Sequence, residues 1–123
     1  MKLNGNLSIH ETVQRPWGFY RTLFLNDSFQ LKIISINPKA QLSLQSHDYR
    51  EEHWTIVEGD GIAQIEEAMV NVSRGSSIFI PKGSKHRLTN TDGNNPLLFV
   101  EVQIGSYFGE DDIHRYEDIY GRA

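Results

Sequence analysis

Turn-forming residues divide the chain into short runs rich in β-branched and aromatic residues, and this pattern limits the possible folds more than any other feature. Segments 26–27, 58–61 and 81–83 are typical turns, with Asn, Asp, Gly or Pro in each. Strands that recur every ~8–12 residues with turns between them are typical of an all-β sandwich or barrel. The predicted strands are 18–25, 29–36, 41–44, 54–57, 61–64, 68–72, 77–80, 85–89 and 97–104.

Helical periodicity is confined to the end of the chain. Within residues 111–120, an apolar set of Ile113, Tyr116, Ile119 and Tyr120 predicts a short C-terminal helical segment. No repeat, linker or low-complexity segment interrupts the chain. Its 123 residues therefore predict a single domain, 1–123.

Composition excludes several classes of protein. Lys and Arg number 12 against 16 Asp and Glu, a net charge of −4, so the chain lacks the basic excess of a nucleic-acid binder. Cysteine is absent, which excludes disulfides, thiol catalysis and cysteine-ligated metal. The longest apolar run is far shorter than the ~20 residues of a membrane span. The first residues also lack the apolar stretch of a secretory signal. We expect a soluble, cytoplasmic protein with no membrane or nucleic-acid partner.

A set of nitrogen and oxygen ligands is spread over three of the predicted strands. Gln45 and His47 are two residues apart, so on a strand they point to the same face. Glu52 follows closely, and His86 lies in a later strand. One carboxylate, two imidazoles and an amide oxygen suit zinc or another borderline divalent ion. Because a neutral amide is a poor ligand, Gln45 has the alternative role of orienting a water molecule.

The later part of this set lies in a recognisable motif. Gly75, Pro81, Gly83, His86 and Asn90 match every specified position of the second cupin motif, over residues 75–90. The resemblance implies a cupin-type double-stranded β-helix, or jelly-roll, barrel.

Residues 40–59 resemble the first cupin motif with two departures. Ala40 stands in place of the first glycine, and Gln45 stands in place of the first histidine, whereas His47, Glu52 and Gly59 are in register. Glutamine at that position is the pattern of phosphomannose isomerases. The resemblance implies a metal, most simply zinc, held by Gln, His, Glu and His.

The similarity continues outside the metal motifs, from about Arg15 to Arg122. It is to the type II mannose-6-phosphate isomerase domain, which in many bacteria follows a mannose-1-phosphate guanylyltransferase in one bifunctional protein. This chain has no glycine-rich phosphate loop after a predicted strand, so we expect no GTP chemistry from it alone. The segments that carry the similarity are 15–18, 52–54, 85–88, 101–103, 109–113 and 120–122.

The resemblance implies a metal-dependent aldose–ketose isomerase that interconverts mannose 6-phosphate and fructose 6-phosphate through an enediolate. That reaction supplies mannose for nucleotide-sugar and polysaccharide synthesis. A divalent ion would stabilise the negative charge that develops on the sugar oxygens.

The reaction also needs a base to move the proton. Glu101 is the candidate, because alternation puts it with Gln103 on one face of its strand, opposite Val100 and Val102. The resemblance implies that this face is the barrel interior. We expect Lys32 to lie near Glu101 and to tune its pKa, and Gln103 to contact the substrate. A buried ion pair between Glu101 and Lys32 or an arginine is the structural alternative.

Cationic side chains are needed for the phosphate group of the substrate. Arg87 is the first candidate, followed by Lys85, Arg50 and Arg15; each has the alternative role of an ordinary solvated charge.

Two further functions stay open. The same site suits another sugar or sugar-phosphate isomerase or epimerase, and a non-catalytic sugar-binding cupin could serve a separately encoded mannose-1-phosphate guanylyltransferase. A homodimer is expected because an open sandwich must protect its edge strands.

Overall fold

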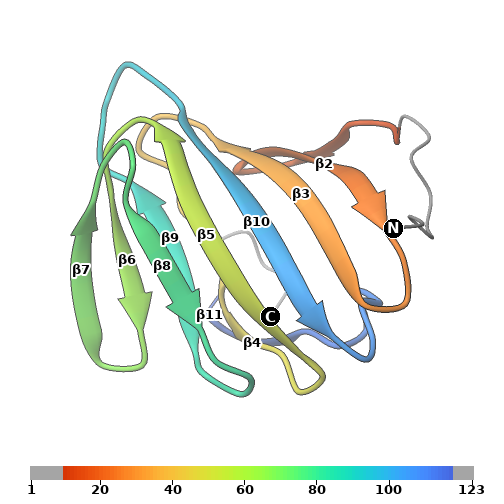
Figure 1. Cartoon of the computed structure of the whole chain (residues 1–123). Helices are drawn as coiled ribbons and strands as arrows, with labels where there is room; N and C mark the ends of the chain where they lie inside the picture. The colour runs from red at the N-terminus through yellow and green to blue at the C-terminus, as the bar shows by residue number, and fades with distance from the viewer. Residues whose placement is uncertain (1–9, 118–123) are drawn as a thin grey trace.

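The computed structural model describes residues 10–117, and their strands form two antiparallel sheets that face each other (Figure 1). The prediction of an all-β fold is confirmed. One sheet has the order β1 (Val13–Arg15), β2 (Gly18–Leu25), β3 (Phe29–Ile36), β10 (Leu97–Gly105), β5 (Arg50–Glu58), β8 (Ser77–Ile80). The other has the order β11 (His114–Glu117), β4 (Leu44–Ser46), β9 (His86–Asn90), β6 (Gly61–Ile65), β7 (Ala68–Val72).

The space between the sheets is apolar at one end and polar at the other. Strands β3, β10 and β5 lie side by side, and the inward side chains of all three change from apolar to polar at the same level. The antiparallel register aligns this change, because Glu101 lies opposite Lys32 on one side and Trp54 on the other. The apolar level is formed by Ile34, Ile36, Trp54, Ile56, Leu97 and Phe99, and the polar level by Gln30, Lys32, Arg50, Glu52, Glu101 and Gln103.

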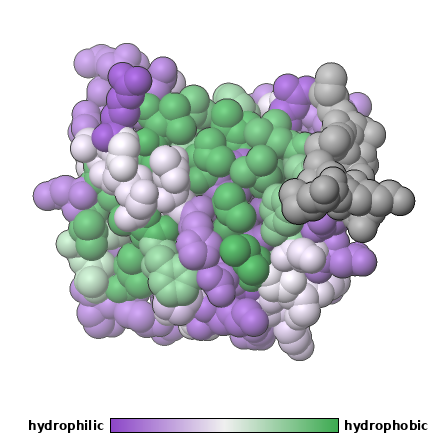
Figure 2. Space-filling model, viewed as in Figure 1, coloured by the Kyte–Doolittle hydropathy of each residue, from purple (hydrophilic) through white to green (hydrophobic). Residues whose placement is uncertain are grey.

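The outer face of the six-stranded sheet is also rich in apolar side chains (Figure 2). Val100 and Val102 alternate with the buried residues of β10 and pair with Ile33 and Leu31 of β3. All four are half-buried although only one face of the sheet covers the core. This part of the sheet therefore has apolar residues on both faces.

Gly18 brings β2 close to β3. Its φ is +147°, and a Cβ atom at this position would lie 2.0 Å from the carbonyl oxygen of Ser35. Since no side chain fits that space, glycine is required for the two strands to pair at this point.

The strand boundaries were predicted with few errors, but the C-terminal helix was not found. Predicted strand 41–44 is wrong for its first part, since β4 spans Leu44–Ser46 and Gln41 makes only an isolated bridge to Thr89. Strand β5 begins earlier than predicted, at Arg50, and β1 and β11 were not predicted.

The helix predicted for 111–120 is wrong over the described part of that range, because β11 pairs there with β4; residues 118–120 lie outside the described residues. Pairing with the edge of a sheet satisfies the backbone of this segment better than a single turn of helix would. The part of the chain that the structure describes contains no helix with the length and hydrophobicity needed to cross a membrane.

Candidate metal centre and cavity

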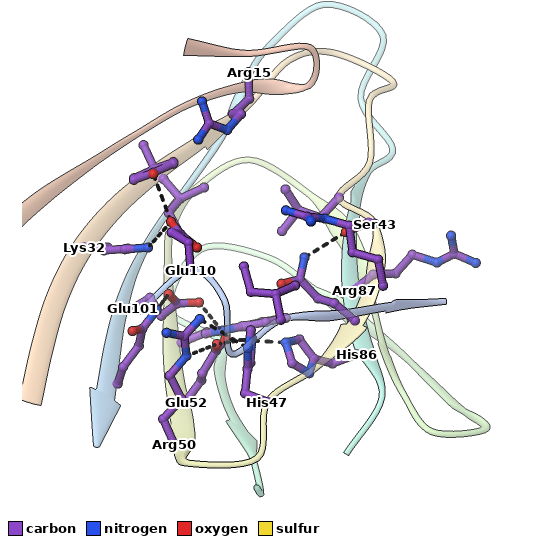
Figure 3. A pocket seen from close by; sticks show the side chains of 18 of the residues that line it. Arg15, Lys32, Ser43, His47, Arg50, Glu52, His86, Arg87, Glu101 and Glu110 are labelled. Carbon is purple, nitrogen blue, oxygen red and sulfur yellow. Dashed lines mark hydrogen bonds and ion pairs between the residues drawn. The ribbon is translucent and has the colours of Figure 1, made fainter. Parts of the chain in front are cut away.

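The polar end of the sandwich holds a cavity of about 130 Å³ lined by residues of both sheets (Figure 3). Three of its lining residues, His47, Glu52 and His86, bring their ligand atoms within 4.8 Å of one another. The Nε2 atom of His47 is 2.9 Å from Oε2 of Glu52, and Nε2 of His86 is 3.6 Å from Oε1. All three side chains are buried. The fold thus brings together one carboxylate and two imidazoles from three separate segments.

Hydrogen bonds to the backbone orient both imidazoles. Nδ1 of His47 is 2.8 Å from the carbonyl oxygen of Asp112, and Nδ1 of His86 is 2.9 Å from that of Ser84. A carbonyl can only accept, so each Nδ1 carries a proton and each Nε2 is the ring atom that faces Glu52. The guanidinium of Arg50 also approaches Nδ1 of His47, but at 3.2 Å, which is longer than the carbonyl contact. Two imidazole nitrogens that face one carboxyl group are a ligand set that fits a divalent cation.

Gln45 reaches the same cavity from β4. It lies opposite His86 in the pairing of β4 with β9, so the two side chains are on the same face. The amide nitrogen of Gln45 donates to the hydroxyl of Ser43 at 2.9 Å. Its oxygen is therefore the atom that faces a ligand, as the predicted ligand set requires.

The carboxyl groups of Glu52 and Glu101 share one donor. The indole N–H of Trp54 donates to Oε1 of Glu52 at 2.9 Å and to Oε1 of Glu101 at 3.0 Å. Burial alone would raise the pKa of the Glu52 carboxyl, but the charge of His86 and the hydrogen bonds from His47 and Glu101 hold it well below its ordinary value. Glu52 is therefore the anion of the pair.

The pKa of Glu101 is shifted in the opposite direction. Burial, the charge of Glu52 and the hydrogen bond to Glu52 raise the pKa of Glu101 well above its ordinary value. Lys32 acts in the predicted direction and lowers this pKa, but burial outweighs it. The ion pair of Lys32 is with Glu110, at 3.6 Å. The alternative of a buried ion pair between Lys32 and Glu101 is therefore wrong.

A chain of hydrogen bonds leads away from Glu101. The amide of Gln103 donates to Oε2 of Glu101 at 2.6 Å, and the amide of Gln30 donates to Gln103 at 2.7 Å. The hydroxyl of Thr22 donates to Gln30 at 3.0 Å. Each donor points toward Glu101, so the chain holds its carboxyl in one orientation. Gln103 lines the cavity, but the contacts it makes in the structure are with Glu101 and Gln30.

The predicted phosphate ligands divide into two groups. Arg15, Arg50 and Arg87 line the cavity. Lys85 is not among the lining residues, and its ammonium lies 4.5 Å from the centre of the Tyr116 ring.

The arginines differ in the partners they already have. Arg87 donates to Gln64 at 3.1 Å and pairs with Glu117 at 3.2 Å. Arg50 is buried, and its Nε and Nη1 atoms have no hydrogen-bond partner. Its Nε lies 4.0 Å from Oε2 of Glu52, so the Glu52 carboxyl is the charged partner of Arg50 within the cavity.

Comparison with known proteins agrees with this geometry. The family model described as mannose-6-phosphate isomerase C-terminal matches residues 3–118. The chain belongs to this family. It is 48% identical over 114 residues to the alginate biosynthesis protein AlgA of Pseudomonas syringae. The matched region covers 93% of this chain and 23% of that protein.

Two other relatives show the same partial coverage. The xanthan biosynthesis protein XanB of Xanthomonas campestris is 47% identical over 114 residues, and this matched region covers 93% of this chain and 24% of that protein. The mannose-1-phosphate guanylyltransferase of Escherichia coli is 41% identical over 94% of this chain and 24% of that protein. The chain thus spans about a quarter of the length of these curated relatives.

Solved structures confirm the cupin fold. The capsular polysaccharide assembling protein CapF of Staphylococcus aureus superimposes with a TM-score of 0.76 at 17% identity, over 89% of this chain and 34% of that one. An RmlC-like cupin of Shewanella frigidimarina gives a TM-score of 0.71 at 16% identity, over 83% of this chain and 87% of that one. A similar protein from Klebsiella pneumoniae is described as a double-stranded β-helix domain. The predicted jelly-roll fold is therefore confirmed.

Sequence reasoning missed two charged residues of the cavity in this member of the family. Glu110 and Arg115 line it; Arg115 comes from the segment for which a helix was expected, and Glu110 directly precedes that segment. Arg115 lies opposite Gln45 in the pairing of β11 with β4, and its Nε atom is buried without a partner. The available signal was the two-residue spacing of Ile113, Arg115 and Glu117, which is the spacing of side chains on one face of a strand. This run is too short to distinguish a strand from a helical turn.

Proposed function

We propose that this chain is a metal-dependent aldose–ketose isomerase that interconverts mannose 6-phosphate and fructose 6-phosphate, acting as one cupin domain. One observation carries the proposal: an oriented His–Glu–His cluster lies next to a second buried carboxyl group, that of Glu101, and the indole N–H of Trp54 donates to both carboxyl groups. Such a reaction needs a cation near the sugar oxygens and a base near the carbon-bound proton.

The residues that would hold a divalent ion are Gln45, His47, Glu52 and His86, and zinc suits this set. When bound, the ion supplies Lewis-acid stabilisation of negative charge on the sugar oxygens. Glu52 alone brings a full negative charge, so the centre keeps a net positive charge.

Glu101 is the proposed acid–base group. Burial beside Glu52 raises its pKa, which brings a carboxyl closer to the range in which it can both accept and return a proton. Trp54 and Gln103 each donate to it and fix its position, so proton transfer between the two sugar carbons needs no rearrangement of the carboxyl.

The test is a coupled assay for fructose 6-phosphate formed from mannose 6-phosphate, with metal content measured in parallel. Metal-loaded wild type is compared with chelator-treated protein, His47→Ala and His53→Ala. His53 is the matched control, because it is exposed on the outer face and pairs with Glu51. We expect activity in wild type and His53→Ala, and loss on chelation or in His47→Ala.

The same assay separates the other candidate functions. Absence of turnover by protein with stoichiometric metal would reject mannose 6-phosphate isomerisation by this chain. Turnover of a different sugar would identify another isomerase or epimerase. Stabilisation by sugar phosphate without turnover would identify a binding cupin.

We further propose a mannose-1-phosphate guanylyltransferase as a partner protein of this chain. In support, one of the longer relatives that the chain matches carries that name. Activity that appears only when such a partner is added would show that the domain depends on it.

We also propose a homodimer through the outer face of the six-stranded sheet. Leu23, Phe79 and Ile104 are exposed on β2, β8 and β10 of this sheet. Figure 2 shows that the outer face of the sheet is rich in apolar side chains. An apolar surface of this kind is complementary to itself across a two-fold axis. Light scattering should give twice the mass of the 14.1 kDa chain, and Ile104→Glu should reduce it to one chain.

A further inference from the structure

A carboxylate of the chain itself occupies the cationic side of the cavity. Glu110, in the loop between β10 and β11, accepts a hydrogen bond from the hydroxyl of Tyr20 at 3.0 Å. The same oxygen lies 3.6 Å from the ammonium of Lys32, which is buried on β3. Figure 3 shows Glu110 and Lys32 pointing toward each other, between Arg15 on one side and the metal cluster on the other.

The surroundings of this carboxylate are strongly positive. The guanidinium of Arg15 lies 5.5 Å from the centre of the Tyr20 ring, and the ammonium of Lys32 lies 4.3 Å from the same centre. Burial alone would raise the pKa of Glu110, but Lys32, the Tyr20 hydroxyl, Arg50 and Arg15 together lower it. Glu110 is therefore an anion that cationic and hydroxyl groups surround, which is the chemistry of an oxyanion site.

The position of Glu110 allows it to leave. Its side chain is 53% exposed, whereas that of Lys32 is 9% exposed. If Glu110 moved into solvent, a buried ammonium would remain beside a tyrosine hydroxyl and an arginine. A buried ammonium without a partner is costly, so another anion has to replace the carboxylate.

The other cationic side of the cavity is less suited to an anion. Arg87 already has Gln64 and Glu117 as partners. Its ion pair with Glu117 lies at the rim of the cavity, where the Glu117 side chain is 61% exposed. Glu117 therefore does not occupy the interior of the cavity. The two ion pairs offer a direct comparison, because each joins one carboxylate to one cation of the cavity lining.

We propose that Lys32, Arg15 and the Tyr20 hydroxyl bind the phosphate group of the substrate, and that Glu110 occupies this subsite until the phosphate displaces it. This inference rests on the proposed function for the identity of the substrate. It makes Glu110 a specificity determinant: a sugar phosphate replaces the carboxylate with a dianion, whereas a neutral sugar that took the place of Glu110 would leave Lys32 without a partner.

The test measures binding of inorganic phosphate to metal-loaded protein by titration calorimetry, without turnover. The variants are Glu110→Gln, Lys32→Met and the control Glu117→Gln, which removes the same charge from the ion pair of Arg87. Glu110→Gln should tighten phosphate binding by about fivefold or more, because it removes a competing anion that is only partly screened. Lys32→Met should weaken binding by at least about tenfold, and Glu117→Gln should leave it unchanged.

Other outcomes would overturn the proposal. Tighter binding in Glu117→Gln but not in Glu110→Gln would place the anion at Arg87. Weaker binding in Glu110→Gln would show that the carboxylate supports the site rather than competes for it. Arg15→Gln, at the more exposed side of the subsite, provides a second variant if Lys32→Met does not fold, and it should also weaken binding.

The result is independent of the isomerase assay. The expected phosphate pattern without isomerase activity would support the subsite and reject the proposed reaction. Isomerase activity with unchanged phosphate binding in Glu110→Gln would support the reaction and reject the subsite.

Discussion

Replacement of Trp54 by phenylalanine tests the bridge between the two carboxyl groups. The variant keeps an aromatic ring in the core but removes the N–H that donates to Glu52 and Glu101. Trp54 is 1% exposed, and its ring centre is 5.3 Å from that of Phe99. Solvent therefore cannot replace the lost donor. We expect a less stable protein with a weaker metal site.

The expected loss can be built from the contacts of the indole. A hydrogen bond to the charged Glu52 contributes about 1.5–3 kcal/mol, and one to the protonated Glu101 about 1 kcal/mol. The smaller ring leaves a cavity that costs about 1–2 kcal/mol more. The sum is about 3.5–6 kcal/mol of unfolding free energy, a large part of the ~5–15 kcal/mol that stabilises a domain.

Trp17→Phe is the matched control. Trp17 is buried in the same core, but its indole N–H makes no hydrogen bond with any residue between His10 and Glu117. Only the cavity cost of about 1–2 kcal/mol applies to it. Both variants and wild type are unfolded in urea after chelation. Equal losses in Trp54→Phe and Trp17→Phe, within about 0.5 kcal/mol, would refute the assigned role of the shared donor. Metal binding by Trp54→Phe should also weaken, by about tenfold.

Other replacements test separate parts of the molecule. Glu101→Gln should lower isomerase turnover by about 10²–10⁴-fold, and a loss of only a few-fold would exclude Glu101 as the base. Burial opposes ionisation of Glu52, but its histidine partners lower its pKa in the folded state, so its contribution to stability is full above its ordinary value of 4.5 and declines as the pH falls below it. Acid titration of chelated protein should therefore destabilise wild type more than Glu52→Gln. Asn90→Ala should cost about 2–4 kcal/mol in urea unfolding, because the buried amide donates to three backbone carbonyls. Gly18→Ala should lower the melting temperature more than Gly75→Ala: both positions have a positive φ, +147° and +89°, so alanine strains the backbone at each, but a Cβ atom meets nothing within 4 Å at Gly75; similar losses would contradict the close approach at Gly18.

Most strands could be predicted because their signals are local. Strands β2, β3, β7 and β8 begin and end where turn residues and alternation placed them. Alternation put Glu101 and Gln103 on one face of β10, opposite Val100 and Val102, and the family resemblance implied that this face is the interior. Strand β11 could not be predicted, because its hydrogen-bond partner is β4, which is distant in the sequence.

The cavity was predictable in composition but not in its pairing of charges. Lys32 was expected to act on Glu101, and it does lower that pKa, but Glu110 takes its ion pair. Arg87 was preferred for phosphate, yet Glu117 of the unpredicted strand already pairs with it. Both differences arise from the segment after β10, whose path across the cavity has no local signal.

The sequence by itself determined the all-β class and the residue types that make a metal site plausible: Gln45, His47, Glu52 and His86. Alternation and turn chemistry act over a few residues, so they can be interpreted without neighbours. Only the tertiary structure decided which carboxyl keeps its proton and which cation already has a partner. Burial and the charges of distant strands set those properties, and folding alone brings such strands within a few ångströms of each other.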